Sequence, residues 1–128
     1  MRKLEEFVIE KLKVSNDTSK YTLFPKDKKE LMRMIDDEVV KNGPTCSLNH
    51  IDVSEITDME GVFRSSIFDG DITNWDVSNV DLMNYMFDHS KFNNRKSLNG
   101  WRVKKNGQRI GMFISSPLAD NEPYFYVV

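Results

Sequence analysis

Two stretches of the chain repeat each other at a distance of 24 residues, and this repeat constrains the fold more than any other feature. The segment 51–54 corresponds to 75–78, and the apolar residues around each copy keep the same spacing. A fixed period of roughly 20 to 30 residues is typical of a solenoid, in which one structural unit buries its apolar side only by stacking on its neighbours. The matched apolar positions are Leu48 and Ile72, Ile51 and Trp75, Val53 and Val77, Ile56 and Val80, Met59 and Met83, Phe63 and Phe87, and Phe68 and Phe92.

A third copy begins at Leu98 and is displaced by 26 residues instead of 24. Two extra residues therefore fall between Phe92 and Leu98, and the polar residues 93–96 in this interval predict a loop. The positions that carry the third copy are Trp101, Val103, Met112, Phe113 and Ser116.

Each copy changes its apolar period part-way along. Apolar and polar residues alternate over 51–54 and 75–78, which predicts strands with one buried face. The apolar residues that follow are spaced by three and four, which predicts a short helix or helical turn. The expected fold is therefore α+β, with two to three strand-turn-helix repeats in a short solenoid. The two tryptophans, Trp75 and Trp101, occupy inward positions and are expected in the core, although a role as stacking platforms stays open.

The segments outside the repeats predict caps. Residues 3–13 carry an amphipathic helical stripe, residues 20–24 have strand-like composition, and residues 28–42 form a second helix. Asp27 and Glu30 make a capping box for the second helix, and Gly43 ends it. Residues 122–128 read as a strand that covers the last repeat. We expect one domain over 1–128, with an N-terminal helical cap (1–43), repeats (46–116) and a C-terminal strand or cap (117–128).

The second copy carries a longer motif, Trp75-Asp76-Val77-Ser78-Asn79-Val80, followed by Met83, Met86, Phe87 and Phe92. This motif resembles the repeats of the BspA-like leucine-rich repeat family of bacteria and their phages. The resemblance implies a leucine-rich-repeat-like solenoid that binds other macromolecules. Many such relatives are exported adhesins with long arrays, whereas small unexported relatives of phages and mobile elements mostly have no assigned role. The third copy departs from the pattern at Arg102, Lys104 and Lys105.

The charges separate along the chain although the net charge is only −2. Residues 52–88 contain nine acidic residues and one basic residue, whereas residues 91–109 contain seven basic residues and no acidic one. The molecule should therefore be electrostatically two-ended. Glutamates interrupt the apolar segment that a secretory signal would need at the N-terminus, and no apolar run has the length of a membrane span, so we expect a cytoplasmic protein.

Catalytic and metal-binding patterns are weak in this sequence. The only two histidines, His50 and His89, lie at non-equivalent repeat positions, so a pairing of Cys46 with His50 is the one arrangement that would favour an enzyme. Asp69-Gly70-Asp71 fails the calcium-loop template because Val80 stands where a bidentate glutamate is required. We therefore expect no catalytic residue, no metal, no cofactor and no small-molecule substrate.

These observations favour a non-enzymatic protein-binding module whose partner has a basic surface. The acidic face expected to bind it consists of Asp52, Glu55, Asp58, Asp76 and Asp81. For Asp52 and Asp76, a purely structural role as turn formers is the competing interpretation. One alternative function is a phage-encoded inhibitor of a bacterial defence complex of the CRISPR type, which would act through the acidic face. Another is nucleic-acid binding, with phosphate contacts from Arg95, Lys96, Arg102, Lys104 and Lys105.

Overall fold

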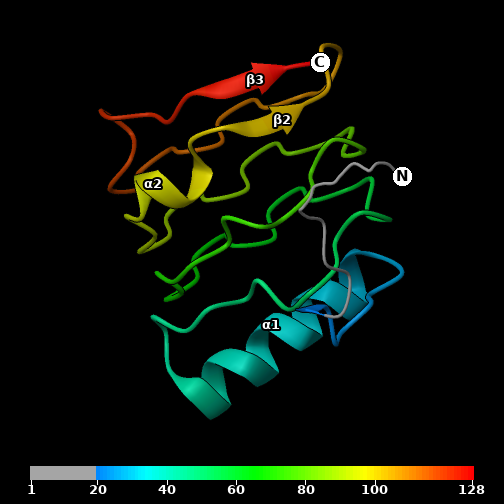
Figure 1. Cartoon of the computed structure of the whole chain (residues 1–128). Coiled ribbons are helices and arrows are strands. Elements are labelled where there is room, and N and C mark those ends of the chain that lie inside the picture. The colour runs from blue at the N-terminus through cyan, green and yellow to red at the C-terminus, as the bar shows by residue number, and fades with distance from the viewer. Residues whose placement is uncertain (1–19) are drawn as a thin grey trace.

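The computed structural model describes residues 20–128, and Figure 1 shows their arrangement. The regular elements are α1 (Lys28–Asn42), α2 (Arg95–Leu98), β2 (Trp101–Val103) and β3 (Phe125–Val127). In Figure 1, α1 lies at one end of the molecule and β2 and β3 lie at the other, with irregular coils between them. No helix within residues 20–128 is long and apolar enough to cross a membrane. The helix predicted at 3–13 lies outside the described residues.

Helix α1 begins and ends as its sequence predicts. The carboxylate of Asp27 accepts from the N–H of Glu30 at 2.9 Å, and Glu30 Oε1 accepts from the N–H of Lys26 at 2.9 Å. At the other end Gly43 has a φ of 91°, and its N–H donates to the carbonyl of Val39. The helix buries Leu31 and Ile35 against the coils. The predicted boundaries, 28–42, are confirmed.

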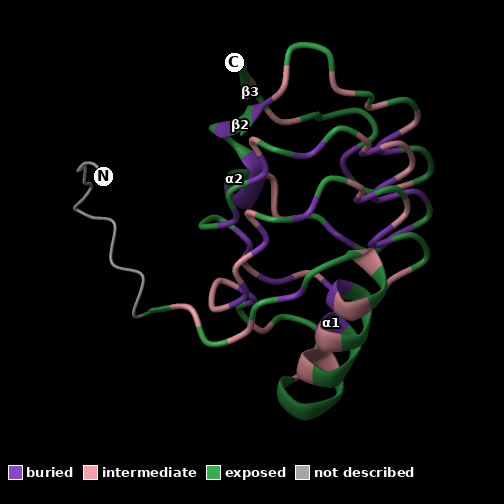
Figure 2. Ribbon diagram, turned by 90° about the vertical axis from the view of Figure 1, so that its right-hand side faces the viewer, coloured by how far each residue is buried: buried purple, intermediate pink, exposed green. Residues whose placement is uncertain are grey.

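Equivalent residues of successive copies lie on top of one another. The rings of Phe63 and Phe87 stack with centroids 5.2 Å apart, and those of Phe87 and Phe113 with centroids 5.5 Å apart. Trp75 and Trp101 stack in the same way at 6.4 Å, and both are buried, which confirms their inward placement. Figure 2 shows the buried residues on the inner sides of the coils. The displacement of 24 and then 26 residues therefore aligns the copies in space.

The segments predicted as short helices are instead ribbons of consecutive turns. We call residues 59–66, 83–90 and 109–116 the first, second and third turn ribbons. In the first, the N–H groups of Val62, Arg64 and Ser66 donate to carbonyls three residues earlier. The intervening N–H groups leave the ribbon and donate to the next one. These donor and acceptor pairs are Met59 with Leu82, Gly61 with Asn84, Phe63 with Met86, and Ser65 with Asp88.

The helix prediction was wrong because it assumed that each segment satisfies its own backbone. An α-helix uses its N–H groups within one segment, whereas here alternate groups bond to a neighbouring coil. The second ribbon repeats this alternation. Its N–H donors are Met83, Tyr85, Phe87 and His89, and the carbonyls that accept are those of Gln108, Ile110, Met112 and Ile114.

The predicted strands at 51–54 and 75–78 do not form regular strands either. Their burial alternates as expected, with Val53 and Val77 both 1% exposed. However, many of the hydrogen bonds between these coils involve side chains. Neighbouring strands would instead be joined by a ladder of backbone hydrogen bonds. Trp75 Nε1 donates to the carbonyl of Leu48 at 2.9 Å, and Asn49 Oδ1 accepts from the N–H of Asn74 at 2.9 Å. The predicted strand at 20–24 is reduced to a single bridge between Leu23 and Ile51.

The last copy contains the sheet. Strand β2 pairs in parallel with β3, which confirms a C-terminal strand over the last repeat, although it is limited to Phe125–Val127. The loop predicted at 93–96 is partly wrong, because α2 begins at Arg95. Asn94 Oδ1 accepts from the N–H of Ser97 and caps this short helix. The leucine-rich-repeat-like class and the division into caps and repeats stay predictions, and the class is taken up under the proposed function.

Candidate functional site

Asp52 and Asp76 lie at equivalent positions of two adjacent coils. Asp52 Oδ1 accepts from the N–H of Ser54 at 3.0 Å, and Asp76 Oδ1 accepts from the N–H of Ser78 at 3.1 Å. Both side chains therefore form turns, as the structural interpretation expects. Asp76 also accepts from the hydroxyl of Ser78 at 2.6 Å.

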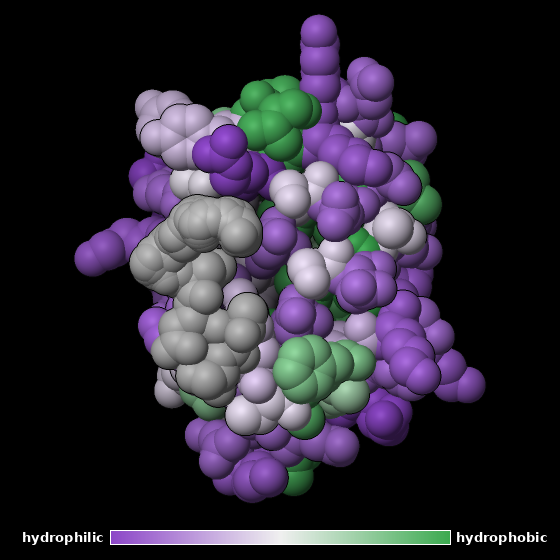
Figure 3. Space-filling view, turned by 45° about the vertical axis from the view of Figure 1, so that its right-hand side comes forward, coloured by the Kyte–Doolittle hydropathy of each residue, from purple (hydrophilic) through white to green (hydrophobic). Residues whose placement is uncertain are grey.

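Tyr21 lies within electrostatic range of these two carboxylates. Its pKa is raised, first by burial and then by the negative charges of Asp52 and Asp76. Its hydroxyl donates to the carbonyl of Asn74 at 3.3 Å. The charges of the two aspartates thus act together on one phenol. The face shown in Figure 3 is mainly hydrophilic, and its apolar areas are small and separate.

The other three residues of the predicted acidic face differ in their partners. Asp58 pairs with Lys28 Nζ at 3.4 Å, and Asp81 pairs with Lys104 Nζ at 2.6 Å. Glu55 is exposed and makes no ion pair with any residue of the described part of the chain. Lysines therefore neutralise two of the five predicted charges. The three acidic residues that make no ion pair within the described part of the chain are Asp52, Glu55 and Asp76.

The predicted phosphate-binding residues are also divided. Arg95 Nε donates to the carbonyl of Glu122 at 3.1 Å, and its guanidinium lies over the ring of Tyr124 at 5.3 Å. Lys104 is paired with Asp81 as described above. Lys96, Arg102 and Lys105 are exposed. Arg102 follows Asp52 and Asp76 in the repeat and pairs in register with Tyr126 of β3.

Cys46 and His50 are both held by Glu38 of α1. His50 Nε2 lies 2.9 Å from the Glu38 carboxylate, and the Cys46 thiol contacts the Glu38 carbonyl at 3.9 Å. Burial and then the charge of Glu38 raise the pKa of Cys46. Because the thiolate is the nucleophilic form, this environment disfavours attack by Cys46.

The Asp69-Gly70-Asp71 turn is used for contacts between coils. Asp69 Oδ1 accepts from the N–H of Asn93 at 2.8 Å, and Asp71 Oδ1 accepts from the N–H of Thr73 at 2.9 Å. The hydroxyl of Thr73 is the main cause that lowers the pKa of Asp71. Within residues 20–128 no cluster of three or more histidine, cysteine or acidic side chains is arranged to hold a metal ion.

A second polar cluster joins the first two turn ribbons at Asp88. Its carboxylate accepts from Arg64 Nε at 2.8 Å and contacts the ring of His89, while the Arg64 guanidinium lies over Tyr85 at 5.1 Å. The hydrogen bond from His89 and then that from Arg64 hold the pKa of Asp88 below its ordinary value, against the effect of burial. Asp88 is therefore a charged group in a largely buried position, with both its oxygens occupied.

Comparison with known families identifies the chain over most of its length. Residues 29–122 match the family described as Mycoplasma protein of unknown function, DUF285. The chain belongs to the DUF285 family. No curated protein and no solved structure matches this DUF285 chain.

Sequence reasoning missed several residues of this DUF285 protein that organise the candidate site. Tyr21 and Glu38 both reach partners that lie more than ten positions away, at Asn74 and His50. Neither residue carries a local motif, so the sequence offered no signal for these contacts. Lys28 and Lys104 were also missed as partners of the acidic face, because ion pairs between coils depend on how the coils are aligned.

Proposed function

We propose that this chain is a non-enzymatic protein-binding module, built on a short BspA-like repeat solenoid, whose acidic face binds a basic protein surface. Its binding residues are Asp52, Glu55 and Asp76, with Asp58 and Asp81 at the margin. The observation that carries the proposal is the placement of Asp52 and Asp76 at equivalent positions of adjacent coils, where the turn bonds use only Oδ1 of each carboxylate.

The backbone supports this use of the face. Turns hold Asp52 and Asp76 in place, so a partner does not have to order these side chains on binding. Like charges held on neighbouring coils repel each other, and a cation from a partner would relieve that repulsion. The expected effect is fast, salt-sensitive association, because electrostatic complementarity acts mainly on the association rate.

Asparagine substitutions separate binding from the structural role of these aspartates. The triple variant Asp52→Asn, Glu55→Gln, Asp76→Asn removes three charges, while asparagine keeps a side-chain oxygen for each turn. The control is Asp36→Asn with Asp37→Asn, which removes two charges from exposed positions of α1. We expect affinity capture from cell lysate, quantified by mass spectrometry, to lose its salt-sensitive partners with the triple variant and to keep them with the control. Equal partner lists for both variants would contradict the proposal.

The anti-defence function is a narrower version of the same proposal. In it the chain acts in the cytoplasm of a bacterium, and the acidic face occupies a groove that normally binds nucleic acid. The captured partner would then be a subunit of a defence complex, and the triple variant would fail to inhibit the nucleic-acid binding of that complex.

Nucleic-acid binding is a second candidate, favoured by the exposed Arg102 next to the exposed Tyr126. A cation beside an aromatic ring suits contact with phosphate and base together. Under this alternative, Lys96→Gln, Arg102→Gln, Lys105→Gln abolishes a low-salt mobility shift with single-stranded DNA or RNA. The absence of any shift with the unmodified protein at low salt would eliminate this candidate.

A further inference from the structure

The third turn ribbon has donors for which the described chain provides no acceptor. In the first two ribbons, alternate N–H groups donate to the carbonyls of the ribbon that follows. The equivalent N–H groups of the third ribbon belong to Arg109, Gly111, Phe113 and Ser115. None of these four donates to another residue within 20–128. A row of unpaired donors at two-residue spacing is the property that makes an open strand edge a template for pairing.

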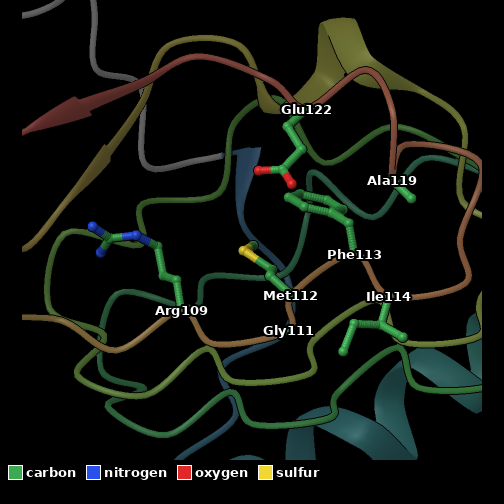
Figure 4. A pocket seen from close by; sticks show the side chains of 7 residues that line it. All are labelled: Arg109, Gly111, Met112, Phe113, Ile114, Ala119 and Glu122. Carbon is green, nitrogen blue, oxygen red and sulfur yellow. The ribbon is translucent and has the colours of Figure 1, made fainter.

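Strand β3 covers only part of this end of the molecule. It pairs with β2, on the side of the coil where Trp101 lies, and leaves the third ribbon beside a pocket of about 210 Å³. Figure 4 shows this pocket, with Glu122 extending over the ring of Phe113 and Arg109 pointing to one side. Gly111 also lines this pocket and is partly exposed, so the backbone there is accessible.

The side chains along this ribbon differ from those at the same positions of the other two. Ile110 corresponds to Glu60 and Asn84, and Ile114 corresponds to Arg64 and Asp88. The isoleucines are 63% and 47% exposed. At these two positions the first and second ribbons thus have polar residues, whereas the third ribbon, which has the unpaired donors, has exposed apolar ones. Apolar residues at such an edge are usually replaced by charge unless the edge is covered.

We propose that the third turn ribbon is a docking edge for a segment of another protein that adopts the same turn-ribbon conformation. This segment would supply carbonyls at every second residue, as the third ribbon does for the second, and apolar side chains against Ile110 and Ile114. Main-chain hydrogen bonds give affinity in such strand addition, and the side chains between them give specificity.

A second copy of this chain does not fit the edge. Two rows of donors do not pair with each other, so the ribbon would need the outward carbonyls of another copy's first ribbon. Helix α1 lies over that side, because Lys28 Nζ donates to the carbonyl of Glu60 at 3.3 Å and Met32 and Val39 border Val62. The acceptor end is therefore covered by α1, whereas at the donor end Ala119 and Glu122 leave a pocket beside the third ribbon. This inference goes beyond the acidic-face proposal, and its test does not depend on that face.

A peptide copy of the third ribbon is the direct probe. Residues 107–116, GQRIGMFISS, dock on the second ribbon within the chain, so the same peptide should dock on the third. In the full ¹⁵N-labelled chain we expect the amide signals of Arg109, Gly111, Phe113 and Ser115 to shift and their hydrogen exchange to slow at least about tenfold. A scrambled peptide of the same composition should leave them unchanged. No specific shift at millimolar peptide would overturn the proposal.

Charge substitutions then locate the docking edge. Ile110→Lys with Ile114→Lys should weaken peptide binding at least about tenfold, because lysine on an open edge blocks pairing. The control Ile67→Lys changes an isoleucine of 60% exposure near α1 and should bind as the unmodified protein does. Equal affinity of both variants would overturn the proposal. So would sedimentation of a dimer that Ile110→Lys converts to a monomer, because the edge would then belong to a second copy.

Discussion

Single residues whose partners lie within three positions were predictable from the sequence. Asp27 caps α1 through Glu30, and Asp52 and Asp76 accept from N–H groups two residues later. These contacts depend on local backbone geometry, which the residue type itself favours. The position of Tyr21 beside two aspartates depends on how distant coils are aligned, so no local pattern contained it.

The Asp88 cluster makes stability depend on pH. Because the folded-state pKa of Asp88 lies below its ordinary value of 3.8, its contribution to stability is complete above that value and is lost as the pH falls through the folded pKa. We expect Asp88→Asn to lower the urea midpoint at pH 7, and the difference from the unmodified protein to fade below pH 3.8. The pKa of Asp71 is also lowered, but Asp71 is present in both proteins, so its effect on stability cancels in the difference. A difference that stays constant from pH 7 to pH 2.5 would contradict the assignment.

Gly70 is required by a close approach of two chain segments. A Cβ at this position would lie 1.8 Å from the carbonyl oxygen of Cys46. We expect Gly70→Ala to destabilise the protein by about 1–3 kcal/mol or more, the usual cost of forced overpacking. Gly107→Ala is the comparison and should cost less, since its Cβ would meet the flexible Arg109 side chain at 3.1 Å and a backbone oxygen, that of Lys104, only at 3.3 Å. Urea unfolding measures both, and similar losses in the two variants would refute the argument.

At the scale of elements, apolar spacing identified the right segments but the wrong conformation. Spacings of three and four place Met59, Val62 and Phe63 on one side of either a helix or a turn ribbon. The choice between them depends on whether alternate N–H groups find acceptors in a neighbouring coil. That information lies in the stacking of copies, which a single segment does not contain.

Left-handed residues within the ribbons provide a test of this conformation. Ser115 has a φ of 55°, whereas Ser116 is not left-handed and its hydroxyl bonds to the carbonyl of Phe113. The left-handed conformation costs a non-glycine residue about 1–2 kcal/mol. A glycine avoids this cost but loses roughly 0.5–1 kcal/mol more in chain entropy on folding. Ser115→Gly should therefore be neutral or stabilising by up to about 1.5 kcal/mol, while Ser116→Gly should destabilise. Thermal unfolding of both variants measures this, and the opposite order would exclude a turn ribbon at 109–116.

At the scale of the whole molecule, the repeat period predicted which residues meet. The alignment of Phe63 with Phe87 and of Phe87 with Phe113 follows directly from displacements of 24 and 26. The sequence also located the two-residue insertion, although it did not reveal that α2 forms there. The stacked rings of the three copies belong to one hydrophobic core.

The middle of the phenylalanine stack should be the most sensitive position. Phe87 contacts Phe63, Phe92 and Phe113 and is fully buried. We expect Phe87→Ala to cost about 3–5 kcal/mol, the range for large cavities in cores. The control Phe24→Ala alters a ring that is 59% exposed and should cost less than about 1 kcal/mol. Urea unfolding followed by circular dichroism and tryptophan fluorescence measures both. A small loss for Phe87→Ala would show that the coils do not share one core.

The direction of the bonds between turn ribbons has an electrical consequence. All eight run the same way, from an N–H in the earlier ribbon to a carbonyl in the later one. They outnumber the four bonds beside the ribbons that run in the opposite sense, from the N–H groups of Asp81, Leu82, Lys91 and Gln108. Aligned peptide dipoles add, as they do along a helix, and leave a partial positive charge at the end near residues 109–116. The formal charges have the same direction as these dipoles, because residues 52–88 are mainly acidic and the charged residues in 91–109 are all basic. The protein should therefore have a permanent electric dipole along the direction in which the coils stack. This dipole should orient the protein in the field of a charged surface before the two make contact. The orientation should weaken with added salt, because the screening length is only about 10 Å at 0.1 M.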